Sequence, residues 1–442
     1  MDPVRSLAAH ILAASVLELF PQSLLIGGDH DGLQFHYDFV FPFEFQKEFI
    51  PLIEEKMRQL IKEQDEVQIF EMVPSVAASF LTHHNQPHRA EEVQEHPDTL
   101  ATVIQLRNFT DYSPFPVETG PFFFKLDPAF SKRDSVVRIS GASFKTKELL
   151  KNFLKSEDPL DLGEDLGLFI QDDNGTLLWL PRGVTLREVL IDWWKKEHID
   201  QGFGSVYTGG DPEAHRTLLD SVPGLSRVAE IGETDLATFR GGEEACISSL
   251  QFFVKILTIF GFKHRLILSK GRSPLLRKAL AQCGLTVEGD GKRVEVRIQD
   301  RWEREWVGPT LELLEGGLIA RQVFTSLEKW ILHLIDHCEG DLPFWLAPEQ
   351  VRICPLKHQD AEAFKAELVA RGFRVQVEGS EKKLGEKIHD ALRERIPYII
   401  VLGEKEQKLK KVSVRAYGAH AEELMDQESF LEKLVEERNH RL

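Results

Sequence analysis

Two side chains near the carboxyl terminus have types and spacing that suit recognition of a nucleobase. Glu406 and Arg415 lie nine residues apart on either side of a lysine-rich turn, so a hairpin or crossed loop would bring them together. Arginine can donate two hydrogen bonds to a guanine edge and a carboxylate can accept from an amino group, each worth about 1–3 kcal/mol of discrimination. The alternative is an exposed ion pair in a solvated turn, which contributes little to stability.

Histidine and cysteine spacing gives no metal or disulfide pattern. The four cysteines are Cys246, Cys283, Cys338 and Cys354. None forms a Cys-x-x-Cys pair, so buried free thiols are favoured and no metal is expected. Three histidines, His83, His84 and His88, border a polar stretch. That stretch, Arg89 to Asp98, lacks an apolar period and indicates a loop, which favours solvated histidines over a new site.

The composition is that of a multidomain protein with an acidic charge balance. At 442 residues, 42% of them hydrophobic, the chain is long enough for two or three domains. It has no apolar run of about 18 residues, and Asp2 and Arg5 interrupt any signal peptide, so we expect a cytoplasmic protein with no membrane partner. The net charge of −17 repels nucleic acid at long range. DNA is therefore not an expected partner, and RNA contact requires a local basic patch.

Periodicity divides the chain into blocks that would position these side chains. Apolar residues recur at helical spacing from Val4 to Leu19, and an alternating stretch follows from Leu33 to Phe39, which predicts an α+β unit. A further helix is expected over Lys147–Leu154. The acidic segment Ser156–Asp165 then places the first domain boundary near 160.

Two further blocks follow that boundary. The central one has helical patterns at about 185–200, 243–262 and 320–338 and strand-like runs at His264–Leu268 and Arg293–Ile298. It predicts a mixed, mostly antiparallel sheet with packed helices. The last block has strands at 351–354, 373–377, 398–402 and 411–414 and helices at 359–371 and 384–395. Its βαβα order predicts an α/β domain with a largely parallel sheet.

Four motifs in the last block carry a family resemblance. They are Trp345-Leu-Ala-Pro-Glu-Gln-Val-Arg-Ile-Cys-Pro355, Leu384-Gly-Glu-Lys-Ile388, Pro397-Tyr-Ile-Ile-Val-Leu-Gly-Glu-Lys-Glu406 and Val412-Ser-Val-Arg415. They resemble the carboxyl-terminal domain of threonyl-tRNA synthetases, which are class II aminoacyl-tRNA synthetases. The resemblance extends over nearly the whole chain. It implies an editing-like α+β domain at 1–160, a degenerate class II catalytic-like domain at 161–340 and an α/β anticodon-binding domain at 341–442.

The resemblance assigns anticodon contacts to four residues. Glu406 and Arg415 match the base-reading positions, and Lys383 and Glu381 precede a helix beside the anticodon. Glu381 stands where the family usually has a neutral amide, a departure that would weaken or change base reading. The implied partner is tRNA, with threonine tRNA as the first candidate.

In the central block the resemblance is to the class II motifs without most of their catalytic residues. Leu180–Arg187 and Gly202–Tyr207 resemble the first motif, which packs two subunits, so a homodimer is expected. Arg227 begins a stretch like the second motif, but the arginine that should follow it to hold the α-phosphate of ATP is missing. ATP and Mg²⁺ are therefore expected only if ligase activity is retained.

Arg321 stands at the position of the adenine-stacking arginine of the third motif. Apart from that match, an arginine near the start of an amphipathic helix is usually a surface or ion-pair residue. The residue before it, a zinc-binding histidine in the family, is Ala320, and the family's zinc-binding cysteine has no counterpart. A catalytic zinc needs about three protein ligands, so zinc is not expected.

The first block resembles the editing domain, which uses two histidines one helical turn apart followed by a cysteine and a histidine. His10 remains, whereas Ala14, Ser113 and Val117 occupy the other positions. A single imidazole does not reproduce a pocket that positions water and ester. Deacylation by the family mechanism is therefore not expected.

These patterns leave three functions open. The leading one is a catalytically silent relative of threonyl-tRNA synthetase that acts by binding tRNA. The second is an active threonine–tRNA ligase or editing factor with non-standard site residues. The third is a regulatory protein-interaction subunit that retains the scaffold without binding RNA.

Overall fold

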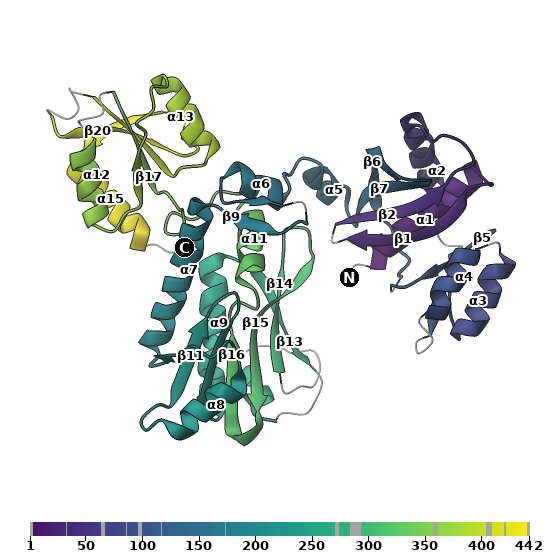
Figure 1. Ribbon diagram of the computed structural model, residues 1–442, viewed down its shortest axis with the longest axis horizontal. Coiled ribbons are helices and arrows are strands. Elements are labelled where there is room, and N and C mark those ends of the chain that lie inside the picture. Colours follow the sequence, from purple (N-terminus) through teal and green to yellow (C-terminus); the bar gives the residue numbers. More distant parts are fainter. Residues whose placement is uncertain are drawn as a thin grey trace. The chain divides into compact units, whose positions relative to one another are not determined.

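The computed structural model describes residues 3–31, 33–62, 67–84, 86–95, 100–115, 117–172, 174–269, 274–282, 293–356, 361–403, 409–419 and 421–439. Two compact units form, Met1–Ser156 and Glu157–Leu442. Each mixes helices and sheets (Figure 1), which confirms the multidomain α+β and α/β fold class. No helix in the described ranges combines the length and apolar character needed to cross a bilayer.

The first unit is built around one long buried helix. Helix α1, Pro3–Leu19, packs on a sheet whose strands run in the order β1 Leu24–Asp31, β2 Gln34–Val40, β7 Val136–Phe144 and β6 Phe123–Arg133. All pairings are antiparallel. The 3-10 turn η1, Lys47–Phe49, and helix α2, Ile50–Lys62, follow β2 and complete this core. The helix and strand expected from Val4 to Phe39 are confirmed, and so is the helix near 147–154, seen as α5 Lys147–Phe153.

A smaller layer completes the first unit. It contains strands β3 Gln68–Met72, β4 Ala101–Leu106 and β5 Phe109–Ser113 and helices α3 Pro74–His83 and α4 Pro87–Glu95. The predicted loop from Arg89 was therefore wrong as far as Glu95, because α4 is helical there. Its buried face consists of Arg89, Ala90 and Val93. An arginine at one buried position hid the apolar period, since buried arginines are rare unless paired.

The central part of the second unit is a seven-stranded sheet. Its strands, in spatial order, are β10 Gly204–Ser205, β11 Arg227–Ile231, β12 Asp235–Arg240, β16 Leu318–Gln322, β15 Glu305–Leu314, β14 Arg293–Gln299 and β13 Lys263–Ser269. Only β10 pairs parallel to its neighbour. The mostly antiparallel prediction is therefore confirmed.

Helices surround this sheet and share its core. They are α6 Pro159–Asp165, α7 Pro181–Asp200, α8 Pro212–Ser221, α9 Glu243–Phe260, α10 Pro274–Gln282 and α11 Leu327–His337. A hairpin of β8 Phe169–Gln171 and β9 Leu177–Trp179 precedes α7, and the 3-10 turn η3 Glu315–Gly317 precedes β16. The helix expected from 320 was wrong at its start. Residues 318–321 are buried on both faces of strand β16, so they lack the alternation that marks a strand.

The carboxyl-terminal part is a five-stranded sheet between helices (Figure 1). Its strands, in spatial order, are β18 Val375–Val377, β17 Val351–Pro355, β19 Tyr398–Leu402, β20 Lys411–Ala416 and β21 Glu423–Asp426, and its helices are α12 Glu362–Ala370, α13 Leu384–Arg393 and α15 Gln427–Asn439. The prediction of a largely parallel sheet holds for β18, β17 and β19 and was wrong for β20. The pairings of β17 are parallel and those of β20 antiparallel, because the link from Leu402 to Lys411 is shorter than the dozen or so residues of a parallel crossover.

Candidate functional site

Arg415 lies on the side of the carboxyl-terminal sheet that carries α13. It is the cross-strand partner of Ile399, which packs with Ala391 and Ile396 against that helix. The alternate residues of β20 enter the core on the other side with Phe430. Helix α13 packs over β17, two strands away from β20 in the sheet order. Arg415 is half-buried, and its Nε has no hydrogen-bond partner among the described residues.

Lys383 and Glu381 lie on the loop that enters α13. Both are exposed, and Lys383 is the N-cap residue, whose backbone N–H donates to the carboxylate of Glu386 at 3.3 Å. The loop and Arg415 therefore belong to the same side of the sheet. Glu406 lies outside the described residues, so its predicted approach to Arg415 stays a prediction.

Arg321 is buried inside the central part of the second unit rather than exposed at its surface. Its side chain on β16 is 1% exposed, and the guanidinium carbon is 4.4 Å from the ring centre of Phe252 and 5.0 Å from that of Phe203. Nη1 donates to Gln201 at 3.0 Å, whereas Nε and Nη2 have no partner in the described ranges. Burial lowers the pKa of Arg321 to about 9. The phenylalanine rings cover the face that a base would need for stacking.

Arg227 lies near the same aromatic group but at the surface. Its guanidinium carbon is 5.7 Å from the ring centre of Phe203 and 5.8 Å from that of Phe239, its cross-strand partner. It donates to the backbone carbonyl of Gln201 at 3.4 Å. The structure thus brings both residual arginines, Arg227 and Arg321, to one aromatic cluster, where they contact protein groups.

A polar cluster lies beside Ala320 in the sheet. Thr238 is the cross-strand partner of Ala320, and its Oγ1 lies 3.0 Å from Nδ1 of His215. Nε2 of His215 lies 3.1 Å from the carboxylate of Glu230. Glu230 also accepts from the backbone N–H of Gly210 at 2.7 Å. Within the described parts of the chain, no group of three His, Cys, Asp or Glu side chains is arranged to hold a metal ion. The His215 imidazole and the Glu230 carboxylate are therefore hydrogen-bonded to one another and to Thr238 and Gly210.

His10 is part of a buried charged network. Its Nδ1 lies 2.8 Å from Oδ2 of Asp111, which also accepts from Tyr37 Oη at 2.7 Å. Arg89 Nε and the backbone N–H of Tyr112 donate to Oδ1, both at 2.8 Å. Burial opposes ionisation of Asp111, but the charge of Arg89 and the contact with His10 outweigh it and hold the pKa of Asp111 well below its usual range. The retained imidazole is therefore occupied in holding a structural carboxylate.

A cavity of about 820 Å³ opens beside Ala14, one helical turn after His10. Glu18, one turn further, pairs with Lys56 and lies 3.5 Å from Arg107. At the position where the family's second histidine would project, the helix therefore presents a methyl group. The histidine that lines this cavity is His84, at the carboxyl-terminal end of α3, whereas His10 is not part of its lining.

The sequence prediction missed the partners of these residues. Asp111 lies two residues before Ser113, which the sequence analysis considered, yet Tyr37 and Arg89 lie far from it in the chain. The available signal was an aspartate within Phe109–Ser113, a strand whose residues are all buried. A buried carboxylate requires donors and a cation, so that isolated acid could have prompted a search for an inward-facing arginine.

The carboxyl-terminal part of the chain matches one family of known domains. Residues 350–437 match the family described as the anticodon binding domain. That range contains the five-stranded sheet with α12 and α13, and most of α15. The chain therefore carries an anticodon-binding domain on its carboxyl-terminal side.

Individual known proteins are similar to nearly the whole chain. This chain is 26% identical to a threonine–tRNA ligase of Acetivibrio thermocellus, with 98% of this chain and 88% of the relative covered. It is 25% identical to one of Dehalococcoides mccartyi, with 94% and 93% covered. The first alignment spans 563 residues against 442 in this chain, so the relative has internal segments that this chain lacks.

A solved structure shows the same fold. The RNA binding domain of threonyl-tRNA synthetase from Cryptosporidium parvum superimposes with a TM-score of 0.57 at 21% sequence identity, covering 63% of this chain and 98% of that one. Together with the relatives and the matched domain, this likeness makes the chain a threonyl-tRNA synthetase-like protein.

Proposed function

We propose that this chain binds tRNA through the side of its anticodon-binding domain that carries Arg415, Lys383 and Glu381, with Glu406 completing the base contacts. The observation that carries the proposal is the domain match at 350–437. It is supported by the half-buried Arg415 on the same side of the sheet as the exposed residues Lys383 and Glu381. Unpaired anticodon bases offer their edges to such side chains. Threonine tRNA is the first candidate because the relatives are named threonine–tRNA ligases.

We further propose that the protein is catalytically silent. The rings over Arg321 support this, because an adenine base would need the guanidinium face that they occupy. The engagement of His10 with Asp111 supports the same proposal for editing. A homodimer, a cytoplasmic location and the division into 1–160, 161–340 and 341–442 complete the proposal, with no DNA partner and neither zinc nor ATP required.

Purified protein incubated with total tRNA at low and physiological salt should retain a subset enriched in threonine tRNA. The variant Glu406→Ala/Arg415→Ala should bind that subset about tenfold or more weakly, because it removes contacts worth about 1–3 kcal/mol each. The measurement is filter binding followed by sequencing of the retained tRNA. The salt dependence should be moderate, since the net charge of −17 limits phosphate contacts.

A matched control is Arg371→Ala. Arg371 is exposed, belongs to the same domain and pairs with Glu367 of α12 at 3.1 Å. It removes one positive charge without touching the α13 side, so it should leave binding near the wild-type level. Equal losses in both variants would show that the effect does not depend on the α13 side, and no retention of any tRNA would exclude the proposal and favour a protein partner.

The names of the relatives favour one other function, an active threonine–tRNA ligase. Threonine-dependent exchange of pyrophosphate into ATP distinguishes it from tRNA binding alone. We expect no exchange above a protein-free control, with or without added Mg²⁺ and Zn²⁺. Exchange that disappears in Arg321→Ala while the protein stays folded would overturn the silent proposal and assign the ATP contact to Arg321.

A further inference from the structure

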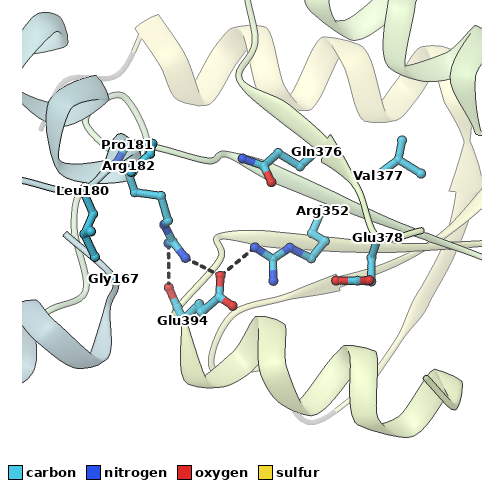
Figure 2. Close-up of a pocket in the computed structure, with 9 residues that line it drawn as sticks. All are labelled: Gly167, Leu180, Pro181, Arg182, Arg352, Gln376, Val377, Glu378 and Glu394. Atoms are coloured by element: carbon cyan, nitrogen blue, oxygen red, sulfur yellow. Dashed lines mark hydrogen bonds and ion pairs between the residues drawn. The ribbon is translucent and has the colours of Figure 1, made fainter. Parts of the chain in front are cut away.

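A junction of ion pairs joins the anticodon-binding part to the central part of the second unit. Its centre is Glu394, the C-cap residue of α13. Arg182, in the first turn of α7, pairs with the Glu394 carboxylate and donates from Nη2 to its backbone carbonyl at 3.2 Å. Arg352 Nη2, on β17, donates to the same carboxylate at 2.6 Å. Figure 2 shows the two guanidinium groups reaching Glu394 from opposite sides, at the edge of a cavity of about 410 Å³.

Burial and charge make this carboxylate hard to replace. Arg352 is 6% exposed and holds Glu349 with two hydrogen bonds of 2.8 and 2.5 Å. Arg182 stands at the amino-terminal end of α7, where the helix dipole disfavours a cation, and burial lowers its pKa while Glu394 opposes that shift. Without Glu394, two partly buried positive charges would face one another across the junction.

The residues on either side of Glu394 reach the central part as well. Arg393 Nη2 donates to Asp165 at 2.9 Å. Arg395 has a left-handed backbone, with φ of 52°, and donates to the backbone carbonyl of Glu339. Left-handed geometry is uncommon for a residue with a Cβ atom. At Gly340 an added Cβ would come within 2.8 Å of Arg395 Nη1, so the fit of this side chain depends on a glycine there.

The apolar cores of the two parts do not provide this connection. Among the described residues, the cluster around β17 and β19 and the cluster around the central sheet have no member in common. In the connecting chain, Phe344 packs in the core around β17 and β19, whereas Trp345 packs in the core around the central sheet. Arg374 also donates to the backbone carbonyls of Trp345 and Ala347 in this connection. Within the described ranges, the polar side-chain contacts between α13 and the central part are confined to the junction around Glu394.

We propose that Glu394 is a lock that holds the anticodon-binding part at one orientation on the central part. The lock fixes the direction in which the α13 side is presented to any ligand. Opening it requires Arg182 of α7 to leave the Glu394 carboxylate, whereas Arg352 of β17 belongs to the same part as Glu394 and moves with it. Orientation is thereby a switchable property of this chain. This orientation is independent of tRNA binding and can be measured without RNA.

The test is a distance measurement by pulsed electron paramagnetic resonance on the full chain. Spin labels go on Lys196→Cys in α7 and Glu432→Cys in α15, two exposed positions, after replacement of Cys283 and Cys338 by serine. The unaltered junction should give one narrow distance distribution. Glu394→Gln keeps the shape and removes the charge, and it should broaden the distribution about twofold or more as further orientations become populated.

Two more variants make the outcome decisive. Arg182→Met keeps the aliphatic stem and should broaden the distribution in the same way, which covers the case that Glu394→Gln unfolds. The control Arg371→Ala breaks the exposed ion pair with Glu367 of α12 and should leave the distance distribution narrow. A distribution of wild-type width in folded Glu394→Gln or folded Arg182→Met would refute the lock, whatever the protein does with tRNA.

Discussion

Replacing Asp111 by Asn is expected to lower the free energy of unfolding of the first unit by about 3–5 kcal/mol, because it leaves the guanidinium of Arg89 buried without its main counter-charge. Arg89 is 1% exposed and Asp111 is fully buried. An asparagine would also present its NH₂ group to at least one donor, among them Tyr37 Oη and the backbone N–H of Tyr112. Glu92, which pairs with Arg89 from the edge of the site, compensates only partly.

The same substitution should change the response to acid. Because Asp111 has a lower pKa in the folded than in the unfolded protein, its contribution is complete above the unfolded-state pKa of about 4 and is lost as the pH falls below it. The wild-type protein should therefore lose more stability than Asp111→Asn between neutral pH and pH values under about 4. Urea melts at several pH values measure this difference.

The distribution of tryptophan separates the two units in these melts. All seven tryptophans lie between Trp179 and Trp345, in the second unit. Asp111→Asn should shift the far-ultraviolet circular dichroism transition more than the tryptophan fluorescence transition. The control is Asp38→Asn, which breaks an exposed pair with Arg138 and should cost less than about 1 kcal/mol. Equal costs for the two variants would show that the buried network carries no special weight.

Periodicity predicted the elements better than it predicted their partners. The helix from Val4, the strand to Phe39 and the alternating order after residue 350 follow from local patterns of apolar residues, which depend only on neighbours three to four or two positions away. Where a buried position is charged, as at Arg89, or where a strand is buried on both faces, as before Gln322, that pattern disappears and the predictions fail.

The site residues illustrate the same limit. The positions of Arg415, Lys383 and His10 could be identified from motifs, but their environments depend on residues far away in the chain. Arg182 and Glu394 are 212 positions apart, and no local pattern links them. The burial of Arg321 under Phe252 likewise requires the packing of α9 on the sheet, which decides whether an arginine that matches a motif is open to a ligand.

Replacing Asp235 is expected to destabilise the protein strongly, because its carboxylate on β12 joins α7 and the segment after β16 in the central part of the second unit. Asp235 is 1% exposed and accepts hydrogen bonds from the backbone N–H of Phe324 at 2.6 Å and of Val323 at 2.9 Å, and from Nε1 of Trp194 at 2.6 Å. Asp235→Ala removes the acceptor of all three donors and leaves them buried. We expect a loss of about 3–5 kcal/mol in unfolding free energy, measured by urea denaturation with tryptophan fluorescence.

Asp220→Ala is the matched control, since it removes an exposed aspartate of the same central part that pairs with Arg240. It should cost less than about 1 kcal/mol. The three groups that donate to Asp235 are not residues to which the family resemblance assigns catalysis or tRNA contact, but the charge of Arg321 also acts on this carboxylate. A large cost there would show that these three hydrogen bonds help to hold the sheet. If Asp235→Ala were as mild as Asp220→Ala, the sheet would have to be held by its apolar core alone, and the joining role of Asp235 would be wrong.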